Sequence, residues 1–169
     1  MTYIVQYRRK REGKTDYKRR LGLLKSKRHR LVVRKSNRYI IAQIVEYKDN
    51  KDIVKVSATS NELKKFGWTE NTLNIPAAYL TGFLCGLRAR SKKIKDAILD
   101  IGLNPSVKGS RLYSTLKGAV DSGLEIPHDS SVLPDEGRIT GKHIAEYRGK
   151  KSILEEFEKT KNNILSQNG

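Results

Sequence analysis

Apolar and polar residues alternate most clearly between positions 31 and 58, where polar breaks separate three short runs rich in Val and Ile. The runs cover residues 31–33, 40–45 and 53–58, and β-branched side chains suit the pleated, half-buried surface of a strand. Ser36-Asn37 separates the first two runs, and Asn tolerates the left-handed backbone of a two-residue hairpin turn. A second polar turn precedes the third run. The pattern predicts a three-stranded antiparallel meander.

The third run also predicts which of its side chains are buried. Val54, Val56 and Ala58 alternate with two polar residues, which is the period of a half-buried strand. We therefore expect these three side chains to lie on the core face of the sheet.

A short helix follows the meander. Residues 59–62, Thr-Ser-Asn-Glu, have the form of a capping box, and Gly67 is placed to end the helix that this box begins. Trp68 comes next. Its apolar neighbours favour a place in the core over a role as a stacking platform on the surface.

The longest helical pattern runs from residue 75 to about residue 92. Asn74 can cap its start, and Pro76 lies in the first turn, where a missing N–H is harmless. Apolar side chains recur at helical spacing at Leu80, Phe83, Leu84 and Leu87. Gly82 and Gly86 lie four residues apart, and we expect them to let this helix approach the sheet closely.

Residues 97–103 form a fourth apolar run, so a strand, a helical crossover and a further strand predict a βαβ unit with parallel pairing. Ser110 is placed to cap a second long helix. An irregular stretch at 134–141 and a short helix at 140–147 follow. The last twenty residues fit either an amphipathic helix or a frayed tail. The expected fold class is α/β, with one mixed sheet and helices packed on it.

Charge is concentrated at one end of the chain. The 169 residues carry 35 Lys and Arg against 18 Asp and Glu, a net charge of +17. Residues 1–38 hold 15 of these cations against 2 acids, a net +13, so the remaining 131 residues carry only +4. Concentrated positive charge without an apolar anchor points to a nucleic acid partner.

The basic end reads as an arm in front of a folded body. Thr15 or Asp16 can cap a helix from Tyr17 to about Lys25, but its apolar stripe is too thin to fold alone. Such arms commonly order on a partner. A flexible solvated tail is the alternative, which aromatic side chains set among so many cations disfavour. We expect an arm at 1–29, an α/β core domain at 30–128 and a C-terminal extension at 129–169.

Two further groups of cations are candidate nucleic-acid contacts. The hairpin tip (residues 34–39) carries Arg34, Lys35 and Arg38, and we expect alanine at these positions to weaken binding with little effect on stability. The second group, residues 108–111, opens the second long helix, where free N–H groups and the helix dipole attract anions. A plain helix cap with two solvated cations explains that group equally well.

Carboxylates provide the one argument for catalysis. Asp96 and Asp100 would share a face of the fourth strand and Asp121 follows on the next helix, so these acids are candidates for a Mg²⁺-dependent nuclease. A chance placement of acids is the simpler explanation. We therefore expect a protein that is not an enzyme.

The sequence gives little support for a metal site, a disulfide or a membrane-spanning segment. Cys85 is the single cysteine, which excludes a disulfide framework within the chain and favours a reducing compartment. His29, His128 and His143 share no ligand spacing, so we expect no metal and no other cofactor. No run approaches eighteen apolar residues, and the first residues lack a signal-peptide layout. These features predict a cytoplasmic protein with no membrane partner.

Seven stretches of the chain resemble one known family. They lie in order at 8–17, 30–38, 40–43, 75–80, 97–103, 116–124 and 143–147. These stretches are similar to the 5S-rRNA-binding ribosomal protein of the large subunit, family number eighteen, and the long helix that opens with Ile-Pro-Ala-Ala-Tyr-Leu resembles its archaeal form. Residues 70–74 depart from the family pattern, and we match the tail after Gly149 to no part of it.

The resemblance implies a structural protein that binds 5S rRNA and helps attach it to large-subunit rRNA in the central protuberance. Implied partners are 5S rRNA, large-subunit rRNA and neighbouring ribosomal proteins, including the other 5S-binding protein, number five. The alternative is a general basic DNA- or RNA-binding protein. With the start of the second long helix included, the expected RNA-binding residues are Arg8, Arg9, Lys10, Arg11, Lys14, Tyr17, Lys18, Arg19, Arg20, Arg28, Arg30, Arg34, Lys35, Ser36, Asn37, Arg38, Tyr39, Lys108, Gly109, Ser110 and Arg111.

Overall fold

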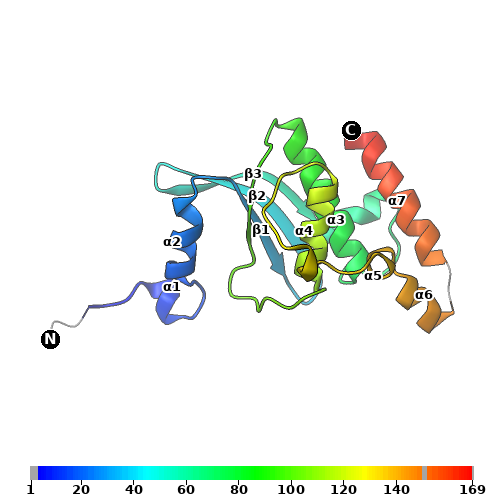
Figure 1. The fold of residues 1–169 in the computed structure, drawn as a ribbon, viewed down its shortest axis with the longest axis horizontal. Helices are drawn as coiled ribbons and strands as arrows, with labels where there is room; N and C mark the ends of the chain where they lie inside the picture. The colour runs from blue at the N-terminus through cyan, green and yellow to red at the C-terminus, as the bar shows by residue number, and fades with distance from the viewer. Residues whose placement is uncertain (1–3, 150–151, 169) are drawn as a thin grey trace.

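A computed structural model describes residues 4–149 and 152–168 as one α/β body with a helical arm at one end (Figure 1). In chain order its elements are α1 (Arg8–Arg11), α2 (Tyr17–Lys25), β1 (Arg30–Lys35), β2 (Ile40–Lys48), β3 (Lys51–Thr59), the 3-10 helix η1 (Ser60–Phe66), α3 (Ile75–Ser91), β4 (Ile98–Asp100), α4 (Arg111–Asp121), the 3-10 helix η2 (Ser130–Val132), α5 (Glu136–Thr140), α6 (Lys142–Arg148) and α7 (Ser152–Asn168). The arm helices α1 and α2 and the C-terminal helices lie at opposite ends of the molecule (Figure 1).

The sheet is mixed, in the order β3-β2-β1-β4. Its first three strands form the expected antiparallel meander, and β4 adds to β1 in parallel. Helices α3 and α4 cover one face, with Leu31, Val33, Ile44 and Val56 among the strand residues buried in the core. The predicted fold class is confirmed.

Short-range signals located the helices well. Asn74 accepts a hydrogen bond from Ala77 N–H at 2.8 Å and caps α3, and Gly67 ends η1 with a left-handed backbone. Asp16 caps α2 by accepting from Arg19 N–H at 3.0 Å. Trp68 is buried in the core, as predicted, and its indole N–H donates to the carbonyl oxygen of Asn71.

The left-handed hairpin turn lies in a different place from the one predicted. Asp49 and Asn50 have positive φ angles of 51° and 59° and join β2 to β3 in two residues. Between β1 and β2 the connection is longer, running from Ser36 to Tyr39. There the Ser36 hydroxyl accepts hydrogen bonds from the N–H groups of Arg38 and Tyr39, which stabilises the connection without a left-handed residue.

A β-bulge in β3 overturns one burial prediction. Ile44 pairs with Val56 but its neighbour Val45 pairs with Val54, so Lys55 is the extra residue. Because the bulge shifts the alternation by one, Val54 leaves the core face and is 50% exposed, whereas Val56 and Ala58 are buried as expected.

The fourth strand pairs in parallel, as predicted, but it is shorter than predicted. It covers only Ile98–Asp100, and it pairs with β1 rather than with β3, from which α3 carries the chain. A left-handed backbone at Gly102 (φ 61°) follows this strand, and the Gly102 N–H donates to the Asp100 carboxylate instead of to a ladder.

Glycines bring α3 against α4, and not against the sheet as we expected for Gly82 and Gly86. A Cβ atom on Gly82 would overlap the backbone of Thr115, and one on Gly86 would overlap the Ser122 side chain. Gly118 on α4 presents the reciprocal case, because its Cβ would overlap the carbonyl oxygen of Tyr79. The two helix backbones are therefore in direct contact.

The C-terminal residues form structure that the sequence left open. Residues 136–140, expected to be irregular, form α5, and the short helix α6 begins two residues later than expected. The last segment is the amphipathic helix α7, whose Ile153, Phe157 and Ile164 are buried in the same core as α3. Across residues 4–149 and 152–168, no helix is both long and apolar enough to span a membrane.

Candidate nucleic-acid interface

A cavity of about 780 Å³ lies between α2, the sheet face opposite α3, and the loop after β4. We call it the arm groove. Its floor consists of Val32, Gln43, Val45 and Val54, so the bulge that exposes Val54 also supplies part of this surface. Its walls carry cations from the arm and from β1: Arg9, Lys14, Arg19, Arg20 and Arg34.

A chain of alternating charges crosses the groove. Arg20 on α2 pairs with Asp52 on β3 at 2.8 Å, and Asp52 pairs in turn with Arg30 on β1 at 2.6 Å. Arg30 reaches Asp100 on β4 at 3.0 Å, and Asp100 also pairs with Arg34 at 2.9 Å. Five side chains from four elements therefore form one network, and each acid lies between two arginines.

Both acids of this network stay ionised. Burial alone would raise the pKa of Asp52, but its hydrogen bonds from Arg20 and Arg30 outweigh burial, and its pKa lies below the ordinary value. For Asp100, burial is again opposed, here by the charge and hydrogen bond of Arg34 and by the Gly102 N–H, and the pKa is lowered. Hydrogen bonding to Asp52 raises the pKa of Arg20.

Arg34 is held more tightly than a residue of the hairpin tip was expected to be. Its guanidinium donates to the Asp100 carboxylate, to the Asp100 carbonyl oxygen at 2.6 Å and to the Val33 carbonyl oxygen at 2.9 Å. It lies over Gly102, where an added Cβ would stand 2.9 Å from the guanidinium carbon. One edge of Arg34 still faces the groove, because the side chain is 42% exposed.

Arg30 does not fit the expected role of an RNA contact. The residue is only 3% exposed, and two of its nitrogens are committed to Asp52 and Asp100. A buried guanidinium that is already paired has no surface to offer to a phosphate. The sequence pattern missed this because the two acids lie 22 and 70 residues away from Arg30.

The other arm cations are spread around the groove and beyond it. Arg9 donates to the Thr15 hydroxyl, and Arg19 donates to the Gly102 carbonyl oxygen, which ties α2 to the loop after β4. Tyr17 lies in the groove wall with Tyr7 packed on it at a ring distance of 5.1 Å. The predicted contacts that are exposed outside the groove lining are Arg8, Lys10, Arg11, Lys18 and Arg28, of which Arg8 pairs with Glu12 and Arg28 with Asp96.

The rest of the hairpin tip is exposed. Lys35, Ser36, Asn37, Arg38 and Tyr39 all face solvent, and Thr72 holds the tip by donating to the Arg38 carbonyl oxygen. Thr72 belongs to the loop in which the sequence departs from the family pattern. The tip therefore presents two cations and a tyrosine on a supported turn.

The start of α4 lies beside the hairpin tip, which the sequence did not predict. Lys35 shares a surface pocket with Ser110 and Arg111, and Pro105 lines both this pocket and the arm groove. Arg111 donates to the Leu73 carbonyl oxygen, and Gly109 adopts a positive φ of 65°. Ser110 occupies the N-cap position, but its hydroxyl makes no cap hydrogen bond. The arm groove and the pocket at the start of α4 thus adjoin at Pro105, beside the hairpin tip.

The three candidate catalytic acids engage separate partners. Asp96 pairs with Arg28, Asp100 belongs to the network, and Asp121 accepts from Lys117 at 2.7 Å and from the Tyr79 hydroxyl at 2.9 Å. In the part of the chain that the structure describes, no three His, Cys, Asp or Glu side chains gather as metal ligands would.

Comparison with known proteins identifies the family to which the chain belongs. The family model described as ribosomal large subunit proteins 60S L5 and 50S L18 matches residues 1–97 and 89–129. The chain belongs to this ribosomal family. Its expected class, a ribosomal protein of the large subunit that acts in translation, is thereby confirmed.

Archaeal members of the family are similar over most of the chain. Large ribosomal subunit protein uL18 of Korarchaeum cryptofilum is 54% identical over 148 residues, which is 88% of this chain and 76% of that protein. The uL18 of Methanothermobacter thermautotrophicus is 52% identical over 145 residues, 86% of this chain and 76% of that protein. The uL18 of Methanococcoides burtonii is 47% identical over 165 residues, 98% of this chain and 95% of that protein.

The last of these relatives corrects one expectation about the tail. We matched nothing in the family to the residues after Gly149, yet an alignment that covers 98% of the chain includes most of α7. The surface pattern of an amphipathic helix is too general to identify a family from its residues alone.

Proposed function

We propose that this chain is the ribosomal protein that binds 5S rRNA and helps attach it to large-subunit rRNA in the central protuberance. The observation that carries the proposal is the arm groove, in which cations from the arm and β1 surround a floor of three valines and Gln43. Family membership supplies the ribosomal setting, and the groove supplies a surface of the right charge.

The groove suits RNA because its cations are positioned on two sides of a solvent-accessible hollow. Arginine guanidinium groups match phosphate oxygens with several donors in fixed geometry, and tyrosine offers a face on which an exposed base can stack. Arg19 and Arg34 both border Gly102 from opposite elements, so a phosphate backbone that follows the groove meets cations in succession.

The hairpin tip and the start of α4 extend this surface. Lys35, Arg38 and Lys108 are exposed cations there, and the pocket lined by Lys35 and Arg111 shares Pro105 with the groove. We assign the groove and arm to 5S rRNA, together with the tip. Large-subunit rRNA and ribosomal protein number five complete the proposed set of partners, with a structural role and no catalysis.

A salt titration with three nucleic acids tests the proposal. The full chain is titrated with a 5S rRNA transcript, a tRNA and a DNA duplex between 50 and 200 mM salt. If six to ten cations contact phosphates, affinity for 5S rRNA falls by roughly 10³–10⁵ across this range. We expect 5S rRNA to bind tightest at every salt concentration. Equal affinities and equal slopes for all three would favour a general nucleic-acid binder and refute the specific proposal.

A further inference from the structure

Acids in a surface built for a polyanion call for an explanation. Besides Asp16, which caps α2, Asp52 and Asp100 both line the arm groove and both are ionised. On electrostatic grounds alone, each would repel phosphate and weaken binding. Each of them also lies between two arginines, so the acids hold the arginine side chains in place and need not contact RNA themselves.

The network runs from a buried centre to two exposed ends. Arg30 and Asp100 form its interior, while Arg20 and Arg34 stand at the ends with side chains 30% and 42% exposed. Arg20 belongs to α2 and Arg34 to β1, and both side chains line the groove. The acids therefore fix the separation of two guanidinium groups that face the same hollow.

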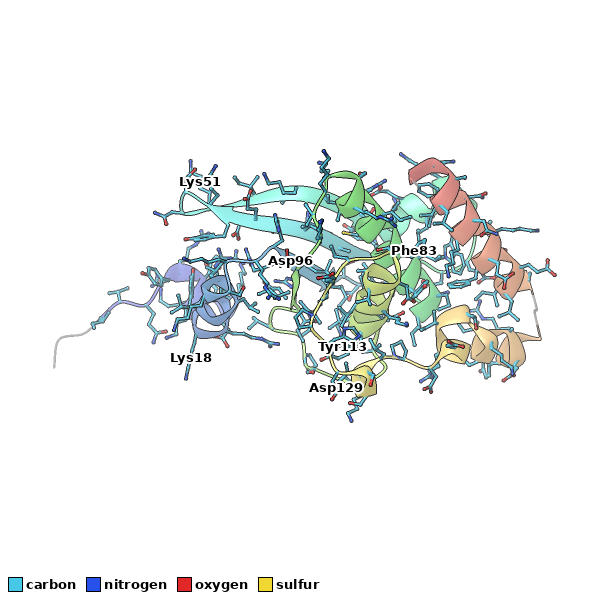
Figure 2. All side chains as sticks on the ribbon, turned by 45° about the horizontal axis from the view of Figure 1, so that its top comes forward. Lys18, Lys51, Phe83, Asp96, Tyr113 and Asp129 are labelled. Atoms are coloured by element: carbon cyan, nitrogen blue, oxygen red, sulfur yellow. The ribbon has the colours of Figure 1, made fainter. Side chains whose placement is uncertain are left out.

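Helix α2 depends on such an anchor. None of its nine residues is buried, and an isolated helix of this length is marginal in water. Its polar and cation–π contacts with the body, within the described residues, are Arg20 to Asp52 at 2.8 Å, Arg19 to the Gly102 carbonyl oxygen at 3.2 Å, and Arg20 over the Tyr47 ring. Asp52 is thus the carboxylate through which the body holds α2. Figure 2 shows Lys18 of α2 at the same end of the molecule as Lys51, the neighbour of Asp52.

We propose that Asp52 is a positioning residue for RNA binding: it docks α2 on the sheet so that the arm groove exists before RNA arrives. Replacing Asp52 would then weaken RNA binding even though the change removes a negative charge from the binding surface. The inference rests on the proposed function, and it adds to that function a residue that need not touch RNA.

The variant Asp52→Asn separates the two effects of the acid. Asp52 accepts from Arg20 through one carboxylate oxygen and from Arg30 through the other. An asparagine side chain offers a single acceptor oxygen and an NH₂ group in place of the second, so it cannot serve both arginines. Asp49→Asn is the matched control, because Asp49 lies in the same hairpin, is exposed, has no partner among the described residues and loses the same charge.

The experiment compares wild type, Asp52→Asn and Asp49→Asn as full chains. Affinity for a 5S rRNA transcript is measured for each, and hydrogen exchange is measured over residues 17–25 in the free proteins. We expect Asp52→Asn to bind roughly tenfold more weakly and to lose protection in α2. Asp49→Asn should bind equally or slightly tighter and keep that protection. If Asp52→Asn binds as Asp49→Asn does, the proposal is overturned.

A second variant distinguishes positioning from general loss of structure. Gly22 lies within α2, and a Cβ there would meet no atom within 4 Å, so Gly22→Ala favours the helix without a new contact. In the Asp52→Asn background we expect Gly22→Ala to restore hydrogen-exchange protection in α2 while RNA affinity stays reduced, because a formed helix still lacks its anchor; full recovery of affinity would contradict the docking role. If wild type prefers no RNA, the proposed function fails, whereas hydrogen exchange in α2 still decides the role of Asp52.

Discussion

Arg34→Ala is the change that best separates the observed role of the hairpin tip from the expected one. From the sequence, Arg34, Lys35 and Arg38 form one exposed set whose removal leaves stability unchanged. The structure divides this set, because Arg34 makes three hydrogen bonds to Asp100 and Val33, while the side chain of Arg38 lies in solvent. Alanine at the two positions should therefore have different effects on unfolding.

The magnitude follows from what Asp100 keeps. After Arg34→Ala, the nearly buried Asp100 carboxylate still accepts hydrogen bonds from Arg30 and from the Gly102 N–H. The variant therefore loses part of the stabilisation of this carboxylate and does not leave it unpaired. Hydrogen bonds to a charged group contribute about 1.5–3 kcal/mol, and partial exposure of Arg34 reduces this, so we expect a loss of about 1–3 kcal/mol. For a chain of this size the melting temperature should fall by roughly 2–12 °C. Arg38→Ala should stay within about 0.5 kcal/mol of wild type.

Fluorescence of Trp68 provides the assay, because this tryptophan is the only one in the chain and is buried in the core. Thermal unfolding is recorded for wild type, Arg34→Ala and Arg38→Ala, and 5S rRNA affinity is measured well below the transitions. Both variants should bind RNA more weakly, and each lost phosphate contact should reduce the salt slope by about 0.7–0.9. Identical melting temperatures for all three proteins would refute the structural role assigned to Arg34.

Two further predictions concern the core and the dependence of stability on pH. Gly118→Ala should destabilise the protein by about 1–3 kcal/mol or more, because its Cβ would overlap the Tyr79 carbonyl oxygen and lie 2.8 Å from Phe83 N. Gly137→Ala, which meets no atom within 4 Å, is the control, and equal melting temperatures for the two would contradict the close helix contact. The lowered pKa of Asp100 implies stability that is fully present above about pH 4, the ordinary value, and lost as the pH falls through the lower folded value. Asp100→Asn should flatten this acid limb in urea titrations carried out below about pH 4, and an unchanged limb would show that Asp100 does not contribute.

Local chemistry predicted much of the fold because its causes lie within a few residues. The cap at Asn74, the stop at Gly67 and the β-branched strands each depend on neighbours in sequence. The turn prediction failed for the same reason, since Ser36-Asn37 and Asp49-Asn50 both have suitable residues. Both pairs lie in hairpins, and the strand register determines which hairpin has a two-residue turn with a left-handed backbone. That turn is Asp49-Asn50.

Long-range pairing explains the rest of what the sequence did not predict. The bulge at Lys55 and the placement of β4 beside β1 depend on contacts between whole strands. In the candidate site, the excess of cations was visible from composition, and so was the arm as a whole. The role of Asp52 and Asp100 could not be predicted from the sequence, because these acids meet their arginine partners only when the sheet has formed.

The parallel pairing of β1 with β4 also bears on the order in which the chain is made. During synthesis the arm leaves the ribosome first, and Asp52 follows Arg20 by 32 residues, while Asp100 follows Arg30 by 70. A nascent chain that ends before Asp100 therefore carries arginines without the acid that forms ion pairs with Arg30 and Arg34. Its arm can attract any nearby RNA by charge alone. If the groove binds RNA as proposed, any selectivity that depends on its formed shape arises late, once Asp100 has emerged and β4 has paired with β1.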